Sequence, residues 1–218
     1  MIAYKNGDWM TCDGYPDTKF NEDADYVIPD DSELATKFKQ YTPNVKVITD
    51  EEGNVIDVQQ DIPVEQLLAD KQKEIKAACE ATIIAGTDAD VLGRGPLHYS
   101  LTNTKQDDIK TLALSIQNGA EGAFWHDDSR VMHEFYTAEQ FMQLYQILYA
   151  FIITCKITSD GLEQYAIDCV TNNDLDTLAT IGWGTVLPEY IQTQVDQQIS
   201  LMLGIPSSTT TEETEATE

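Results

Sequence analysis

The sequence predicts an α+β protein: a small N-terminal unit of strand, helix and hairpin is joined by a helix to a mostly helical domain with one or two β-hairpins. Three observations predict this fold class. Short β-branched runs flank an acidic turn near residue 50, an amphipathic pattern covers 64–85, and a strongly apolar helical stripe follows residue 137. The predicted parts are a small α+β unit at 1–60, a connecting helix at 61–86, a mainly helical domain at 87–205 and an acidic disordered tail at 206–218.

The N-terminal unit is predicted from three local patterns. The run 24–28 (ADYVI) has the β-branched and aromatic composition of a strand. From Asp31, which can cap a helix, apolar residues recur with the spacing of one helix face as far as Tyr41. Two β-branched runs, 45–48 and 55–58, surround an acidic turn with a glycine, and this arrangement predicts a hairpin.

The connecting segment is predicted to be one long helix. Apolar residues recur with helical spacing over 64–85, and Gly86 follows as the glycine that commonly ends a helix. The pattern permits a trimeric coiled coil or packing of one face on the body of the protein. Lys71 and Lys73 interrupt the apolar seam, which favours one-sided packing.

The helical domain is predicted to start with a helix and a hairpin. Thr104 and Asp107 have the spacing of a capping box, and Asn118–Gly119 ends the helix that they would open. Before the helix, His98–Leu101 reads as an extended strand. The runs 124–126 and 131–136 flank a polar turn and predict an antiparallel hairpin.

A strongly apolar helix is predicted after this hairpin. Thr137 and Gln140 form a second capping box. The apolar residues that follow cover most of the helix circumference, so we expect Leu148 and Ile152 to be almost fully buried in the centre of the core. Asp160–Gly161 is expected to break this helix, and further helices are predicted at 162–170, 174–180 and 187–203.

Charge restricts the partners of the chain. Of its 218 residues, 13 are Lys or Arg and 38 are Asp or Glu, which gives a net charge of −25. Nucleic acid and anionic membrane surfaces would repel such a chain, so neither is an expected partner. The N-terminus lacks the pattern of a signal peptide, and the apolar run 147–153 falls short of the roughly 20 residues that span a bilayer. The four cysteines form no CxxC pair and are expected to be reduced thiols: Cys12, Cys79, Cys155 and Cys169.

The second hairpin contains the strongest cluster of metal-ligating residue types, namely His126, Asp127, Asp128, His133 and Glu134. A metal site requires three or four ligands that converge with fixed geometry. Residues near a hairpin turn point to both faces of the hairpin, so the pattern favours an acidic turn between two strand histidines. No metal site is predicted, and His126 and His133 are the candidates that would hold an ion if one were bound.

Enzymatic motifs are missing from the sequence. It contains no nucleophile elbow, no P-loop and no dinucleotide-binding glycine pattern. The glycine pair at 93–95 precedes no lysine, His98 is expected to be a hydrogen-bonded structural histidine, and the acidic turn 50–54 lacks the closing Glu of a calcium loop. We therefore expect no catalytic residue and no cofactor, and we expect that the chain is not an enzyme.

The order of short motifs along the second half carries a resemblance to a known family. The motifs are, in chain order, Ala77–Ala81 with Gly86, His98–Thr102, the helix with Gln106, Asp107, Ile109 and Leu112, Gly119–Ala120, Trp125–Asp127, Phe135–Glu139, Leu178, Ile181–Gly184 and Leu187–Glu189. Over 75–200 this order resembles the DUF4376-type domain found in tail-gene clusters of tailed phages and prophages, especially those of Gram-positive gut bacteria. Relatives show His-Ala-Asp-Gly where this chain has the residues 126–129 (HDDS).

The resemblance implies a function without catalysis. It implies a structural or adaptor component of a phage tail, baseplate or tail-fibre apparatus that contacts other tail proteins and resides in the virion after synthesis in the host cytoplasm. The alternative that it leaves open is a tail-fibre assembly chaperone that is not retained in the particle. Tail fibres and their adaptors are commonly built with cyclic symmetry, so a homo-oligomer is expected, with a trimer favoured.

Overall fold

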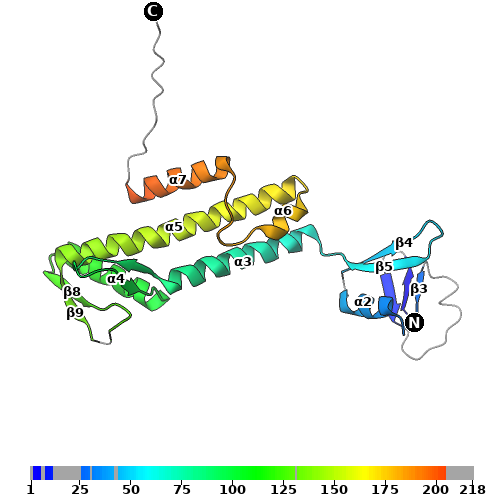
Figure 1. Ribbon diagram of the computed structural model, residues 1–218, viewed down its shortest axis with the longest axis horizontal. Helices are drawn as coiled ribbons and strands as arrows, with labels where there is room; N and C mark the ends of the chain where they lie inside the picture. Colours follow the sequence, from blue (N-terminus) through cyan, green and yellow to red (C-terminus); the bar gives the residue numbers. More distant parts are fainter. Residues whose placement is uncertain are drawn as a thin grey trace, which may run out of the picture. The chain divides into compact units, whose positions relative to one another are not determined.

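The computed structural model describes residues 2–5, 8–11, 26–29, 31–41, 44–130 and 132–204 (Figure 1). The chain divides into two compact units, Met1–Leu67 and Leu68–Glu218, and each is described by itself. Strands with one helix in the first unit and a mostly helical second unit confirm the predicted α+β class. The predicted tail at 206–218 and Cys12 lie outside the described residues.

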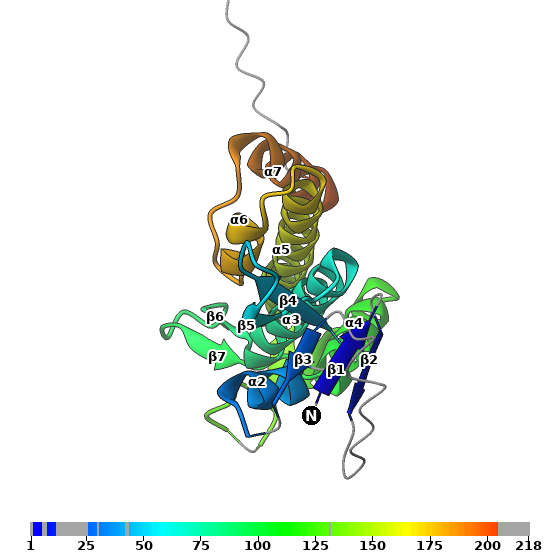
Figure 2. The same cartoon turned by 90° about the vertical axis from the view of Figure 1, so that its right-hand side faces the viewer.

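The first unit contains two separate antiparallel sheets. β1 (Ile2–Lys5) pairs with both β2 (Asp8–Thr11) and β3 (Tyr26–Ile28), so that β1 is the middle strand (Figure 2). β4 (Val45–Thr49) and β5 (Val55–Gln60) form the predicted hairpin. The predicted strand before the helix is present as β3, whereas β1 and β2 were not expected from the sequence.

The helix of this unit, α2 (Glu33–Tyr41), was predicted, but its cap was assigned to the wrong residue. The Ser32 hydroxyl accepts a hydrogen bond from the Ala35 N–H at 3.1 Å and donates one to the Pro29 carbonyl at 2.6 Å. Ser32 therefore caps the helix, not Asp31. A serine hydroxyl can accept from the first turn and donate backward at once, which an ionised aspartate cannot do.

The β4–β5 turn explains the acidic residues that could suggest a calcium loop. One Asp50 carboxylate oxygen accepts hydrogen bonds from the Glu52 and Asn54 N–H groups at 3.0 and 2.8 Å, and the other accepts from the Asn54 side chain at 3.0 Å. The hydrogen bonds from Asn54 lower the pKa of Asp50. The carboxylate therefore closes the turn as an Asx-type acceptor.

The second unit is formed mainly by helices and by two short antiparallel hairpins. In chain order its elements are α3 (Val64–Ala85, which begins in the first unit), β6 (Thr87–Ala89), β7 (Leu97–Tyr99), α4 (Asn103–Gln117), β8 (Gly122–Trp125), β9 (Glu134–Thr137), α5 (Ala138–Thr171), α6 (Leu175–Thr180) and α7 (Glu189–Leu203). The predicted helix at 64–85 is confirmed, and so is the predicted end of α4 at Asn118–Gly119. The cap of α4 was misplaced: the Thr102 hydroxyl, not Thr104, accepts the N–H of Lys105.

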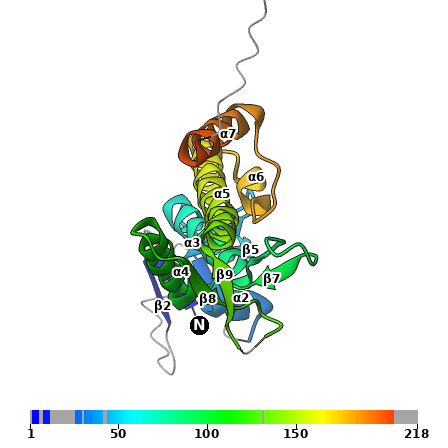
Figure 3. The ribbon, with the colours of Figure 1, turned by 90° about the vertical axis from the view of Figure 1, so that its left-hand side faces the viewer.

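α5 is the centre of the core, as the sequence predicts. Its capping box of Thr137 and Gln140 is present, and Leu148 and Ile152 are only 1% and 6% exposed. α7 lies along one side of α5 and α3 along the other (Figure 1), while α4 and the β8–β9 hairpin pack near its N-terminal end (Figure 3). The buried face of α3, formed by Ile75, Cys79 and Ile83, packs on this body, which confirms one-sided packing within the unit.

The predicted break at Asp160–Gly161 is wrong, because α5 continues through both residues to Thr171. Gly161 has ordinary helical backbone geometry and is fully enclosed by α7 and the segment before it. A Cβ atom on Gly161 would lie 2.6 Å from Cγ2 of Val195 and 3.0 Å from Cδ1 of Leu187. The glycine is therefore required for close helix approach, and tertiary packing outweighs its helix propensity, which is about 1 kcal/mol worse than that of alanine.

By length and composition, α5 is the one helix among the described residues that could cross a membrane. The apolar run 147–153 thus belongs to a helix of 34 residues, which is longer than the sequence pattern indicated. Buried core helices meet the same criterion. Lys156, Asp160 and Glu163 interrupt the apolar surface of α5, and charged groups are costly inside a bilayer, so the packing and composition are those of a core helix.

Substitution of Gly161 tests whether the close contact between α5 and α7 stabilises the second unit. We expect Gly161→Val to lower the free energy of unfolding by about 1–3 kcal/mol, because the added methyl groups overlap Val195 and Leu187. Denaturant unfolding of the intact chain measures this change. Adding Val195→Ala should recover part of the loss, and a Gly161→Val protein as stable as the wild type would contradict the packing argument.

Candidate functional site

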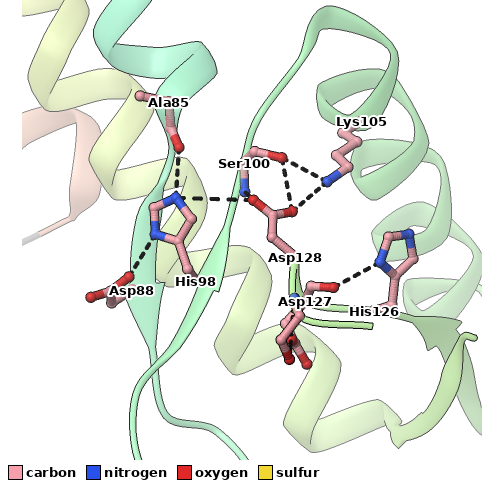
Figure 4. Close-up of polar contacts among 9 residues, drawn as sticks. Ala85, Asp88, His98, Ser100, Lys105, His126, Asp127 and Asp128 are labelled. Carbon is pink, nitrogen blue, oxygen red and sulfur yellow. Dashed lines mark hydrogen bonds and ion pairs between the residues drawn. The ribbon is translucent and has the colours of Figure 1, made fainter. Parts of the chain in front are cut away.

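Polar side chains from four segments gather at one end of the second unit (Figure 4). The segments are the end of α3, the β6–β7 hairpin, the first turn of α4 and the connection that follows β8. We call this group the polar cluster; its members are the Ala85 carbonyl and the side chains of Asp88, His98, Ser100, Lys105, His126, Asp127 and Asp128.

Gly86 positions the two segments on which His98 depends. Its φ of +89° ends α3, and a Cβ atom would lie only 2.0 Å from the Tyr99 carbonyl oxygen. The backbone of β7 can therefore approach the end of α3. Gly86 occupies the predicted position after the helix and is required there twice, for its left-handed φ and for this approach.

His98 is held as a bridge between α3 and β6. Its Nδ1 lies 2.6 Å from the Asp88 carboxylate, and its Nε2 lies 2.8 Å from the Ala85 carbonyl. Both partners only accept hydrogen bonds, so the arrangement favours an imidazolium with both nitrogens protonated. The hydrogen bond to Asp88, followed by the one to Ala85, raises the pKa of His98 above its ordinary value. The expected structural role of His98 is consistent with this geometry.

Asp128 joins the β8–β9 connection to α4 and to the residue after β7. Its carboxylate accepts hydrogen bonds from the Ser100 N–H at 3.0 Å, the Ser100 hydroxyl at 2.9 Å and the Lys105 ammonium at 2.7 Å. Burial acts to raise the pKa of Asp128, but the hydrogen bonds from Lys105 and Ser100 outweigh burial and lower it. The Asp128 N–H also donates to the His98 carbonyl at 2.9 Å. Four hydrogen bonds thus fix one end of the connection.

Asp127 is fully buried beside Asp128. One carboxylate oxygen accepts hydrogen bonds from the Ser129 N–H at 2.8 Å and from the Ser129 hydroxyl. The other receives no hydrogen bond and faces Nε of Arg130 at 3.4 Å. Burial acts to raise the pKa of Asp127, but the Ser129 hydrogen bonds and the Arg130 charge together lower it. A buried carboxylate that stays ionised in this way requires its partners, so it holds the turn in one conformation.

A second polar network links the two hairpins. The Tyr99 and Tyr136 hydroxyls are buried and lie 3.2 Å apart, and Tyr136 donates to Glu134 at 3.3 Å. Burial raises the pKa of both tyrosines. Glu134 also pairs with Arg94 of the β6–β7 loop and with Arg130 at 2.8 Å. The contacts of Tyr99 with Tyr136 and of Arg94 with Glu134 therefore join the β6–β7 hairpin to the β8–β9 hairpin.

The predicted histidines come together, but the predicted carboxylates do not join them. The rings of His126 and His133 are in edge-to-face contact, with centroids 4.7 Å apart. His126 Nδ1 donates to the Asp127 carbonyl at 2.9 Å. Asp127, Asp128 and Glu134 are engaged with serine, lysine and arginine groups as described above. In the part of the chain that the structure describes, no three His, Cys, Asp or Glu side chains are grouped as metal ligands.

A cavity of about 420 Å³ lies between α3, α5 and the start of α4. Its floor contains Cys79, which is 6% exposed. Burial raises the pKa of this thiol, whereas activation of a cysteine nucleophile requires a lowered pKa. Asp160 at the rim has its pKa raised by burial and then by Glu163. The cavity therefore offers an inactive thiol and a mixed rim of acidic and basic groups.

The outer face of the β8–β9 hairpin was missed by sequence reasoning. Ala123, Trp125 and Tyr136 point into the core, whereas Phe124 and Phe135 are 62% and 51% exposed on the other face. The two rings are direct cross-strand partners with centroids 5.4 Å apart in an edge-to-face arrangement. An antiparallel hairpin with one face on the core normally carries polar residues on the other. The sequence did contain a signal for this face: each strand has two adjacent aromatic residues, Phe124–Trp125 and Phe135–Tyr136, and adjacent residues of a strand point to opposite faces.

This surface continues onto α4 and the connection. We call it the aromatic face and define it by Leu112, Phe124, His133 and Phe135. A groove of about 250 Å³ runs along it, lined by Asp108, Thr111, Leu112, Phe124, Trp125 and His133. Contiguous exposed apolar residues of this kind mark interaction surfaces.

The pH dependence of stability tests the His98 bridge. The pKa of His98 is raised on folding, so its contribution is fully present below the unfolded pKa of about 6.5 and is lost as pH rises through the folded pKa. We expect the difference in unfolding temperature between the wild type and His98→Gln to shrink as pH rises through the folded pKa of His98. An NMR titration should place the His98 midpoint above the ordinary histidine pKa of about 6.5. A constant difference across this range would contradict the charged bridge.

Chelation tests the two histidines of the second hairpin. Because the nearby carboxylates are bound elsewhere, we expect a chelator to leave the unfolding temperature of the wild type and of the His126→Ala and His133→Ala variants unchanged. Elemental analysis should find no stoichiometric zinc. A zinc ion lost on substitution of either histidine would overturn this interpretation.

Comparison with known proteins gives one match. The family model described as "Domain of unknown function (DUF4376)" matches residues 66–180, which is more than half of the chain. No curated protein and no solved structure matches the chain. The matched range contains the whole polar cluster and the aromatic face, and it ends before α7. It starts and ends earlier in the chain than the range 75–200 over which the motif order carries the resemblance. The chain therefore belongs to the DUF4376 family.

Proposed function

We propose that this chain is a non-enzymatic structural or adaptor component of a phage tail, baseplate or tail-fibre apparatus and that it acts through protein–protein contacts. The observation that carries the proposal of a contact function is the aromatic face, in which Phe124 and Phe135 are exposed on a hairpin whose polar residues are bound internally. The phage setting rests on the resemblance of the motif order to domains encoded in tail-gene clusters.

The polar cluster supports a contact function because its groups bind each other. His98 and Asp128 of the cluster each bind two other residues, and in the second polar network Glu134 pairs with Arg94 and Arg130. Such a network preorganises residues 126–130 and the start of β9 at Glu134, next to the exposed residues of the aromatic face. A surface that is rigid before binding loses less conformational entropy when a partner docks.

Analysis of purified particles tests the proposal. We expect mass spectrometry to detect this chain in intact particles and cryo-electron microscopy to show density for it in the tail. A native mass three times the 24.4 kDa chain would support the expected trimer. If the chain is absent from particles but binds a tail-fibre protein in infected cells, it is the assembly chaperone instead. A chain that is absent from particles and binds no tail protein would contradict both functions.

A further inference from the structure

We propose that the aromatic face binds a cationic polypeptide segment of a neighbouring protein, in which apolar side chains alternate with lysine or arginine. This inference deepens the proposed contact function and rests on it. It names the surface of this chain that makes the contact and the chemistry of the partner.

The apolar part of the surface is built rather than accidental. Gly122 has no side chain, and a Cβ atom there would lie 2.5 Å from the Phe135 ring. The ring therefore lies over the glycine backbone, where it covers the strand and meets Phe124. Trp125 forms part of the groove wall from the inner side of the hairpin. The groove of about 250 Å³ has room for one large apolar side chain.

The charge at the groove favours a cationic partner. Asp108 lines the groove, and its side chain makes no hydrogen bond or ion pair with the residues that the structure describes. Arg130, a positive charge in the connection, is already paired with Glu134 at 2.8 Å and with Asp127 at 3.4 Å. Exposed aromatic rings also attract lysine and arginine through their π faces. A segment with alternating cationic and apolar residues would place one kind in the groove and the other on its acidic rim.

The same charges argue against a second copy as the occupant. Asp108 lines the groove of each copy, so two copies that meet at this face would bring like charges together, whereas a trimer formed through another face would not. A cationic segment gains from the same field. Lys110, the lysine closest in sequence to Asp108, is 3.7 Å from Asp107, so that ion pair leaves Asp108 available to the partner.

The binding experiment uses the intact chain and two synthetic probes. The first is a short peptide in which lysines alternate with valine and phenylalanine, and the second has glutamate in place of each lysine. Isothermal titration gives the dissociation constant, and NMR chemical shifts of the backbone amides locate the site. We expect the lysine peptide to bind, to shift the amides of Phe124, His133 and Phe135, and to bind more weakly as salt is added. The glutamate peptide should not bind.

Variants separate the aromatic face from the rest of the surface. Phe124→Ser with Phe135→Ser should weaken binding of the lysine peptide at least tenfold, and Asp108→Asn should weaken it and reduce its salt dependence. Leu114→Ser is the matched control, because Leu114 is 58% exposed on α4 but does not line the groove. Phe124→Ser alone tests the same face if the double variant fails to fold, since Phe124 is 62% exposed and lines the groove.

The outcomes divide cleanly between this inference and the proposed function. Equal binding of both peptides, or unchanged binding by the aromatic variants, would overturn the cationic occupant. Self-association of the chain that is lost in the aromatic variants would also overturn it, because a second copy would then fill the face. Detection of the chain in particles does not depend on any of these results. The contact function can therefore stand while this surface or its partner chemistry is rejected.

Discussion

The apolar circumference of α5 is the constraint on which the second unit depends. A helix with this many apolar residues has to be covered on most sides, so α3, α4, α7 and the β8–β9 hairpin all pack on it. The cover on one side can come close only because Gly161 has no side chain. The hairpin covers the other end with Ala123, Trp125 and Tyr136, and this demand fixes which of its faces points inward. Its outer face is then free of any packing role.

The polar cluster fixes what the apolar core leaves undetermined. Burial of Trp125 and Tyr136 orients the strands, but it does not define the path of the chain between them. Asp127 and Asp128 define that path, because each carboxylate is held by donors from its own turn or from α4 and the residue after β7. A buried ionised group without its partners would be unfavourable, so these contacts select one conformation of the connection. The core and the cluster together present His133 beside Phe124 and Phe135.

Local patterns in the sequence predicted most of the fold but little of the site. Helix periodicity located α3 and α5, because burial of one face or of most faces leaves a direct trace in the sequence. Gly161 was misinterpreted as a break, since its role depends on α7, which lies far away in the chain. The caps were displaced by one or two residues because several neighbouring residues could accept the same hydrogen bonds. The bridge from His98 to Ala85 and Asp88 joins segments through backbone geometry that no spacing rule describes.

The aromatic face shows why an exposed surface is hard to predict from one sequence. Phe124 and Trp125 are adjacent in one strand. The apolar run alone does not show whether both residues are buried or only one of them, nor which one. The register puts Phe124 with Phe135 on one face and Trp125 with Tyr136 on the other, and packing on α5 decides which face is inside. In this hairpin the inner pair reaches the core and the outer pair stays exposed beside an unpaired carboxylate. Stability of this unit explains the inner pair. The outer rings contact each other and the backbone at Gly122 but stay more than half exposed, and this exposure is the observation behind the proposed intermolecular contact.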